Sequence, residues 1–243
     1  MRAGPVAWHD VECSSYSADL DHWRELASNA RGPVLDLGCG TGRVALDLAA
    51  RGHDVTAVDA DGALVAELGR RARERDLQMD SVIADARSIT LERRFALAFA
   101  AMQVVQLLGG SKGRLALLDR VREHLLPGGR FAAALADPFE AIAPEDALPP
   151  LPDVTELDGW VLSSRPLDVR REPGGVAVRR LRQLVSPAGE LVEELHTVLL
   201  EDVTPAELER EALACGLHAA GRRPVAATDD HVGSTIVVLA APA

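Results

Sequence analysis

The chain has 243 residues, 47% of them hydrophobic, and its 37 acidic residues outnumber the 26 Lys and Arg to give a net charge of −11. This length suits one large domain, or one domain with an elaboration, and a sizeable core. The acidic balance disfavours a nucleic-acid-binding protein, which usually carries a basic face. No apolar run reaches the roughly 18 residues of a membrane span, no signal peptide is visible, and the three cysteines form no zinc or disulfide pattern. We therefore expect a cytoplasmic protein that has no metal site and binds neither nucleic acid nor membrane.

The N-terminal segment contains one expected helix. Residues 1–10 are predicted to be poorly structured, whereas residues 17–30 carry an apolar stripe with the spacing of a helix face. Tyr16, the only tyrosine in the chain, precedes this helix. It is either a lid residue over a ligand site or a packing residue at the start of the helix.

A glycine-rich turn follows the first predicted strand at residues 34–37. The turn carries Gly38, Gly40 and Gly42, and a helix begins at Arg43. Such a turn presents backbone N–H groups and the positive end of a helix dipole to a ligand. Glycine permits positive φ values and a close approach of the ligand. Arg43 takes the place of the third glycine of the dinucleotide fingerprint, which disfavours a nicotinamide-dependent oxidoreductase.

Acidic residues stand in or after the first three predicted strands. Asp36 lies within the first strand, where its negative charge suits a cationic ligand. Asp59 ends a strand at residues 54–58, about 20 residues past the glycine turn, and is placed to bind both hydroxyls of a ribose. Asp85 ends a third strand at residues 81–84. These features predict a nucleotide-sized pocket at the carboxyl ends of the strands.

The fourth predicted strand, at residues 95–102, is apolar throughout, as a central parallel strand should be. Its carboxyl end carries Met102, Gln103 and Gln106. Ligands of open parallel sheets lie outside the carboxyl ends of the strands. The two glutamines therefore either hydrogen-bond a substrate or cap the turn.

Helices are expected between these strands, at residues 62–75 and 112–126, and a fifth strand at 130–135. A proline-rich stretch at 137–152 indicates an irregular connection. Strand-like segments follow at residues 160–166, 176–185 and 191–200. Gly174-Gly175 and the hairpin signal at 186–189 separate them, so an antiparallel element is inserted after the fifth strand.

The C-terminal segment predicts one helix and two strands. Thr204 and Glu207 form a capping box, with Pro205 at the first helical position. The helix ends at Gly216, and strands follow at residues 217–225 and 234–240.

The pattern Asp36-x-Gly38-x-Gly40-x-Gly42, together with Asp59 and the segment 84–86, resembles the class I S-adenosylmethionine-dependent methyltransferases of the small-molecule type. The resemblance covers about residues 34–136. It implies an α/β, Rossmann-like, doubly wound fold with a seven-stranded, mostly parallel sheet whose last strand is antiparallel. On this basis we expect a single methyltransferase domain over residues 1–243. Its parts are an N-terminal helical lid (1–32), a cofactor-binding core (33–136), inserted antiparallel strands (137–202), and a C-terminal helix with the last strands of the sheet (203–243).

The resemblance also implies a binding site for S-adenosylmethionine. Asp36 would meet the amino group of the cofactor, Asp59 its ribose, and Asp85 its adenine amino group. The expected cofactor-binding residues are Asp36, Gly38, Cys39, Gly40, Gly42, Asp59, Ala60, Asp85, Ala86, Met102 and Gln103.

An antiparallel last strand makes the loop at residues 226–233 hang over the pocket, because that strand begins at the edge where the preceding strand ends. His231 in this loop is the candidate general base, with Asp229 or Asp230 to orient it. The alternative is a solvent-exposed histidine in a polar loop. The expected substrate-contacting residues are Tyr16, Gln103, Gln106 and His231.

The predicted function is methyl transfer from S-adenosylmethionine to an oxygen or nitrogen atom of a small molecule. The segment after the fourth strand carries neither an acid nor the Asn/Asp-Pro-Pro-Tyr motif found in some members of the family. This departure disfavours methylation of nucleic-acid bases. It also keeps open an alternative, a non-catalytic protein of the same fold that binds S-adenosylmethionine or S-adenosylhomocysteine. The inserted strands either roof the active site or build a homodimer contact.

Overall fold

The computed structural model describes residues 3–136, 151–228 and 231–243, and it contains two β-sheets. The larger sheet has seven strands in the order β10-β11-β5-β4-β1-β2-β3. Its strands are β1 (Val34–Leu37), β2 (Val55–Asp59), β3 (Asp80–Ile83), β4 (Phe95–Ala100), β5 (Leu125–Ala136), β10 (His218–Val225) and β11 (Ser234–Ala240). All neighbouring pairs are parallel except those that β11 makes with β5 and β10. The predicted fold class is therefore confirmed.

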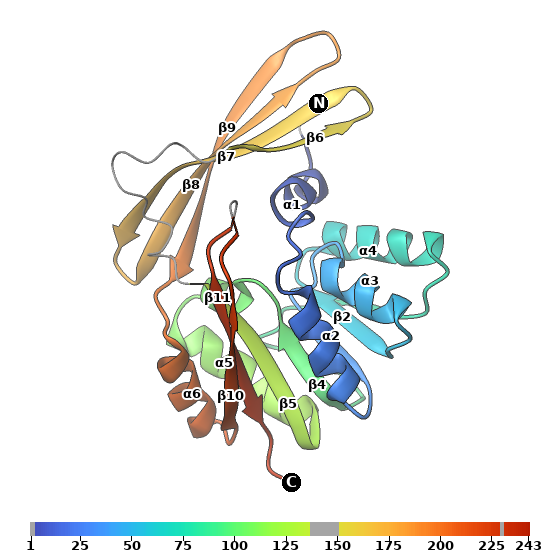
Figure 1. Cartoon of the computed structure of the whole chain (residues 1–243), viewed down its shortest axis with the longest axis vertical. Helices are drawn as coiled ribbons and strands as arrows, with labels where there is room; N and C mark the ends of the chain where they lie inside the picture. The colour runs from blue at the N-terminus through green and yellow to red at the C-terminus, as the bar shows by residue number, and fades with distance from the viewer. Residues whose placement is uncertain (1–2, 137–150, 229–230) are drawn as a thin grey trace.

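The antiparallel β11 brings distant parts of the chain to one edge of this sheet. Ser234, its first residue, pairs with Val225 at the end of β10 and with Ala136 at the end of β5. The end of β10 and the start of β11 thus lie on the edge where the parallel strands end (Figure 1). This edge also receives the glycine turn that follows β1.

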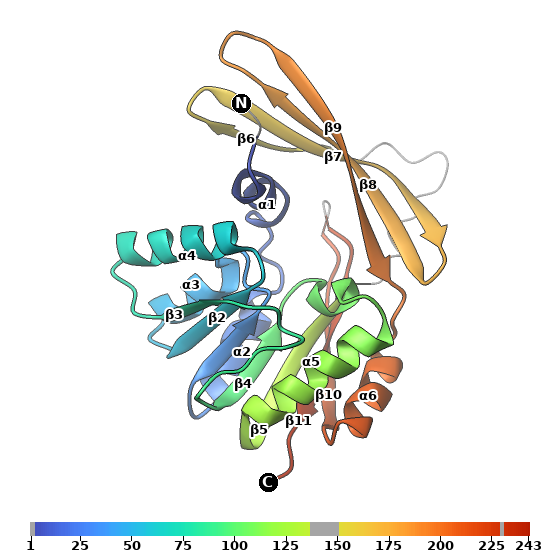
Figure 2. The same cartoon turned by 180° about the vertical axis from the view of Figure 1, so that it is seen from behind.

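Helices cover both faces of the seven-stranded sheet (Figure 2). One face carries α2 (Leu20–Asn29), α3 (Arg43–Ala50) and α4 (Gly62–Glu74), and the other carries α5 (Ser111–His124) and α6 (Pro205–Ala214). A hydrophobic core lies on each face of the sheet, and alternate residues of β5 pack into one or the other. Phe131 and Ala133 pack with α5. Ala132 and Ala134 pack with α2 and α3 on the opposite face. A strand buried on both faces reads as a continuous apolar run. None of the helices described here is long and apolar enough to cross a membrane.

The second sheet is inserted between β5 and α6 and stands above the first (Figure 1). Its antiparallel strands, in sheet order, are β6 (Asp153–Leu157), β7 (Trp160–Glu172), β8 (Gly175–Val185) and β9 (Leu191–Glu201). The sequence predicted the last three of these strands and their hairpin but missed β6, because most of its residues are exposed and show no apolar alternation. Most of the predicted irregular connection, residues 137–150, lies outside the described residues.

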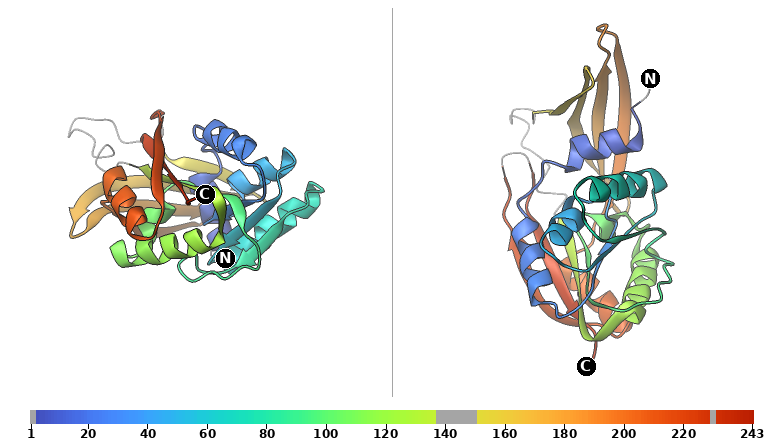
Figure 3. Two further views of the ribbon diagram at one scale, coloured as in Figure 1. Left: turned by 90° about the horizontal axis from the view of Figure 1, so that it is seen from below. Right: turned by 90° about the vertical axis from the view of Figure 1, so that its right-hand side faces the viewer.

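The expectation that residues 1–10 are poorly structured is wrong, because Pro5–Cys13 forms helix α1. Trp8 and Val11 of this helix pack against Leu162 and Leu184 of the second sheet. The helix lies between that sheet and the edge of the larger one (Figure 3). A distant part of the chain therefore stabilises α1, and its own sequence shows no amphipathic repeat long enough to predict it. Helix α2 begins at Leu20, later than expected.

The two ends of the insertion are joined by one glutamine side chain. Gln106, in the 3-10 helix η1 (Val104–Leu107), is fully buried. Its amide donates to the carbonyl oxygens of Ala136 (3.0 Å) and Glu201 (3.2 Å) and accepts from the backbone N–H of Ala136 (2.9 Å). Ala136 ends β5 and Glu201 ends β9. The segments that enter and leave the insertion are thus held to the same side chain.

We predict that Gln106→Ala lowers the free energy of unfolding by at least ~2 kcal/mol, because buried backbone groups that lose their partner cost about 1–3 kcal/mol each. Urea denaturation followed by circular dichroism measures the change. Gln78→Ala is the matched control, since Gln78 is exposed. Equal unfolding midpoints for the two variants would show that the buried amide contributes nothing.

Candidate functional site

The glycine turn after β1 has the backbone conformation that the sequence predicts. Gly38, Gly40 and Gly42 have φ values of +73°, +55° and +95°. Space is also restricted, since a Cβ at Gly38 would lie 2.5 Å from Val104 Cγ2 and one at Gly40 would lie 2.1 Å from His9 Nε2. Larger residues are therefore excluded by conformation and by contact.

The backbone N–H groups of this turn are largely used within the protein. Gly38 and Cys39 donate to the Val58 carbonyl oxygen (2.8 and 3.0 Å), and Gly42 donates to the Cys39 carbonyl oxygen (2.9 Å). Gly40 donates to Asp59 Oδ2 (2.9 Å). The turn therefore shapes a site, but these four amides are not free to bind an anion, contrary to the expectation from sequence.

A cavity of about 440 Å³ opens beside the turn, at the carboxyl ends of β1, β2 and β4. Seven of the predicted cofactor-binding residues line it: Asp36, Gly38, Cys39, Asp59, Ala60, Met102 and Gln103. Gly40, Gly42, Asp85 and Ala86 do not line it. Met102 has a φ of +54°, which is uncommon for a residue other than glycine and is found at functional sites.

Asp36 is the most unusual group of this cavity. Its carboxyl is 2% exposed, and Oδ1 has no hydrogen-bond partner among the residues that the structure describes. Burial raises its pKa to about 8, and the nearby Arg43 offsets only part of this rise. A buried polar atom without a partner is rare and costly in a folded protein. Such groups are candidates for functional sites.

Asp59 links the turn to the end of β2. One carboxylate oxygen accepts from the N–H of Gly40, and the other accepts from the N–H of Asp61 (both 2.9 Å). Each carboxylate oxygen has a further lone pair. Asp59 is therefore oriented by backbone donors and still has acceptor sites directed to the cavity that it lines.

Arg43 fastens the segment before α2 to the turn. Its guanidinium donates to both oxygens of Asp19 (2.6 and 2.7 Å) and to the Tyr16 carbonyl oxygen (2.9 Å). Tyr16 is buried, and its ring centroid lies 4.7 Å from that of His231. The structure thus brings together two of the predicted substrate-contacting residues, whereas Asp229 and Asp230 lie outside the described residues.

The other predicted substrate-contacting residues are separated. Gln103 lines the cavity. Gln106 is fully buried, and its amide is engaged by backbone groups, so it offers no polar atom to a substrate. The structure therefore supports the alternative interpretation of Gln106, a structural one, and not the expected substrate contact.

Comparison with known proteins finds a family model and several proteins that are similar to this chain. Residues 34–129 match the family model of a methyltransferase domain. The cypemycin N-terminal methyltransferase of a Streptomyces species is 35% identical over 107 residues, which is 44% of this chain and 43% of that protein. The glycopeptide N-methyltransferase MtfA, solved with S-adenosylmethionine, is 25% identical over 95% of this chain and 97% of its own, with a TM-score of 0.58. The sugar N-methyltransferase KedS8 of Streptoalloteichus is 17% identical over 100% of this chain and 94% of its own, with a TM-score of 0.72.

The match over residues 34–129 and the cypemycin relative support the predicted resemblance to the class I S-adenosylmethionine-dependent methyltransferases. Several of the similar solved structures are S-adenosylmethionine-dependent methyltransferases, in agreement with the predicted family. The chain spans less than half the length of the curated relatives that it matches. The methyl acceptors of these relatives are therefore not assigned to this chain by similarity alone.

Asp85, the expected partner of the adenine, is engaged elsewhere. Its carboxylate accepts from the side chain of Arg87 (2.6–3.1 Å) and from the backbone N–H of the same residue (2.8 Å). These contacts lower its pKa, with the Arg87 side chain as the largest cause. Asp85 is thus ionised and already paired with Arg87. It does not line the cavity beside the glycine turn.

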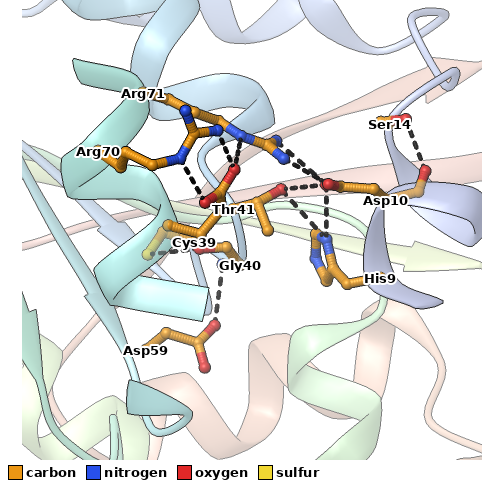
Figure 4. Close-up of polar contacts among 10 residues, drawn as sticks. His9, Asp10, Ser14, Cys39, Gly40, Thr41, Asp59, Arg70 and Arg71 are labelled. Atoms are coloured by element: carbon orange, nitrogen blue, oxygen red, sulfur yellow. Dashed lines mark hydrogen bonds and ion pairs between the residues drawn. The ribbon is translucent and has the colours of Figure 1, made fainter. Parts of the chain in front are cut away.

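Two residues of α1, His9 and Cys13, also line the cavity, and sequence analysis missed both. The neighbouring Asp10 accepts from Thr41 Oγ1 (2.8 Å) and from Arg71 of α4, which fastens α1 to the glycine turn (Figure 4). Burial raises the pKa of the Cys13 thiol to about 11, so it is not a thiolate at neutral pH. The only available signal was a histidine and an acid in a segment without a helical pattern.

We predict that Asp36→Asn stabilises the ligand-free protein increasingly as pH rises from about 4 to about 8. The unfolded chain releases the Asp36 proton near the ordinary carboxyl pKa of about 4, whereas the folded chain retains it until pH about 8. The folded wild type therefore loses up to ~1.4 kcal/mol per pH unit in this window, and the variant does not. Urea denaturation at a series of pH values measures the difference, and a pH-independent difference would contradict the assignment.

Proposed function

We propose that this methyltransferase binds S-adenosylmethionine in the 440 Å³ cavity and transfers the methyl group to an amine nitrogen of a small molecule. The buried carboxyl of Asp36 carries the first part of the proposal, because its Oδ1 has no hydrogen-bond partner among the described residues. A ligand with an ammonium group gives Asp36 Oδ1 the hydrogen-bond donor that the described residues do not supply. The cavity and its residues therefore fit the cofactor of the family.

The residues of the cavity have distinct roles in this proposal. Asp36 faces the ammonium of the cofactor, and Asp59 accepts from the ribose hydroxyls with its remaining lone pairs. Met102 and Gln103 lie beneath the methionine end. Asp85 and Ala86 are the proposed adenine contacts, and Arg87 has to share Asp85 with the adenine amino group.

The bound cofactor supplies a methyl group that its sulfonium already activates. The chain contributes orientation, since holding an acceptor in line with a reacting group is worth up to about 7–11 kcal/mol. His231, in the loop above the sheet edge, is the proposed base that takes the proton of an ammonium acceptor, and Tyr16 packs against its ring.

A second cavity on the same edge supports an amine as the acceptor. It has a volume of about 560 Å³ and lies where β5 and β10 end and β11 begins. Among the described residues that line it, Asp202 is the only charged one, and Thr204, Ser234 and Thr235 add hydroxyl groups. The Asp202 carboxylate has no side-chain partner in the part of the chain that the structure describes. An acid with hydroxyl neighbours suits an ammonium that carries polar substituents.

The names of two relatives point to the same acceptor atom. One methylates an N-terminus and the other is a glycopeptide N-methyltransferase. We infer that an amine of a small natural-product-like molecule, rather than a hydroxyl, is the acceptor.

We predict methyl transfer from radiolabelled S-adenosylmethionine to a panel of amino sugars and short peptides, and none to the matched hydroxy compounds. Asp202→Asn should raise the KM for the amine about tenfold with little change in kcat, because a charge-assisted hydrogen bond is worth about 1.5–3 kcal/mol. Glu156→Gln, at an exposed position of β6, is the control. Cofactor binding without any methylated product would instead favour the non-catalytic alternative.

We also propose that β9 joins two copies of the chain. Among the described strands β9 pairs only with β8, so one side of it is an open edge. It contains neither Lys nor Pro, which commonly protect such edges. Leu191, Leu195 and Leu199 lie on one face of this strand and are 54%, 61% and 47% exposed.

The sequence of β9 is complementary to itself in the antiparallel direction. With Leu195 opposite its own copy, Leu191 faces Leu199 of the partner subunit, and Glu194 faces His196 of the partner subunit. Apolar pairs and an acid–histidine pair thus coincide in one register. A two-fold axis through Leu195 makes the contact isologous, as in most homodimers.

We predict that analytical ultracentrifugation finds a dimer of the wild type and a monomer of Leu195→Glu, because like charges directly opposite each other destabilise a strand pair. Leu213→Glu is the control, since Leu213 on α6 is equally exposed at 59%. A monomeric wild type, or a dimer that Leu195→Glu leaves intact, would contradict this interface.

A further inference from the structure

Another cavity lies at the edge of the seven-stranded sheet opposite the cofactor site. It has a volume of about 340 Å³, and its lining residues come from the amino ends of β2 and β3 and from the segment before β4. Cavities of this size hold small ligands. It shares no lining residue with the cofactor cavity or with the cavity that contains Asp202. This amino-edge cavity is therefore separate from the proposed site of methyl transfer.

Thr56, the second residue of β2, lines the amino-edge cavity with a buried hydroxyl. The residue is 3% exposed, and its Oγ1 has no hydrogen-bond partner among the residues that the structure describes. Side chains alternate between the faces of a strand, so Thr56 lies on the same face as Val58, which packs in the core beside α5. A buried hydroxyl without a partner is costly. A polar ligand in this cavity would remove that cost.

Two carboxylates accompany this hydroxyl. Asp80 is the register partner of Thr56 in the parallel β2–β3 pair, so both side chains leave the same face of the sheet on strands about 4.8 Å apart. Glu92, from the segment before β4, also lines the cavity, and its side chain has no hydrogen bond or ion pair within the described ranges. Thr56, Asp80 and Glu92 thus present oxygen acceptors to one space.

The amino-edge cavity keeps a negative charge despite one arginine. Arg93 is the only basic residue among the described residues that line it. Its guanidinium donates to both carboxylate oxygens of Asp54, with 3.2 Å between Nη1 and Oδ1. Its contact with Asp80 is longer, 3.5 Å between Nη1 and Oδ2. Arg93 is therefore compensated mainly by Asp54, and the charges of Asp80 and Glu92 remain for a cation.

We propose that the amino-edge cavity binds a small aliphatic amine in its ammonium form. An ammonium has three N–H donors, and Thr56, Asp80 and Glu92 offer three acceptors. Val82 and Leu91, which also line the cavity and pack against the core, contact the aliphatic part. Hydrogen bonds between ionised groups are the stronger kind, and an anion would be repelled by the two carboxylates. The site does not depend on the proposed cofactor and acceptor cavities.

Three ligands of equal chain length separate the charge from the donors. Butylamine carries an ammonium, butyltrimethylammonium carries the charge without an N–H, and butanol carries no charge. Titrations of the full chain, followed by the backbone amide NMR signals of Val82, Leu91 and Glu92, give the three dissociation constants. Butylamine should bind at least about tenfold more tightly than the other two, because only butylamine makes charge-assisted hydrogen bonds.

Variants assign the site to these residues. Thr56→Val and Glu92→Gln should each weaken butylamine about tenfold. Thr155→Val and Glu156→Gln, at exposed positions of β6, are the matched controls and should change nothing. Asp202→Asn should also leave the affinity unchanged, because Asp202 lies in the cavity proposed for the methyl acceptor. Circular dichroism checks the fold of Thr56→Val, and the exposed position of Glu92 keeps a second variant in the test.

Two results would overturn the inference. One is an absence of shifts at these amides, or equal affinities for the three ligands. The other is a loss of affinity in Asp202→Asn with unchanged affinity in Thr56→Val and Glu92→Gln, because butylamine would then occupy the acceptor cavity.

Discussion

The hydrogen bond from the Gly40 N–H to Asp59 Oδ2 is the contact on which the site depends. It joins the turn after β1 to the end of β2, and the other oxygen of Asp59 receives the N–H of Asp61 at the start of α4. One carboxylate thus determines the distance between two adjacent strand ends. Because these amides of the turn are satisfied internally, the turn needs no ligand to complete their hydrogen bonds.

This constraint explains the unusual chemistry of Asp36. The turn closes over β1, so the Asp36 carboxyl is removed from water without gaining a full set of partners. A carboxyl in that condition destabilises the ligand-free protein at neutral pH. Functional sites commonly retain such costs because a ligand relieves them, and here the missing partner is a hydrogen-bond donor for Oδ1.

Helix α1 connects the cofactor cavity with the inserted sheet. Its apolar residues Trp8 and Val11 pack on that sheet, and Glu12 pairs with Arg182. On the opposite side Asp10 binds Thr41 of the glycine turn. The insertion is also tied to the floor of the cavity by Gln106 at its base.

The sequence by itself determined the seven-stranded sheet, the glycine turn and most of the cavity floor. These elements are local, since a strand, a tight turn and a helix within about ten residues carry their own periodicity and backbone requirements. Asp36, Asp59 and Gln103 were found because the carboxyl ends of parallel strands meet at one edge. Only the tertiary structure decided the rest. Helix α1 is stabilised by a sheet some 150 residues away in the chain, and Gln106 is engaged by backbone groups at the ends of β5 and β9. A side chain's partners depend on packing between distant segments, which the pattern of a single segment does not contain.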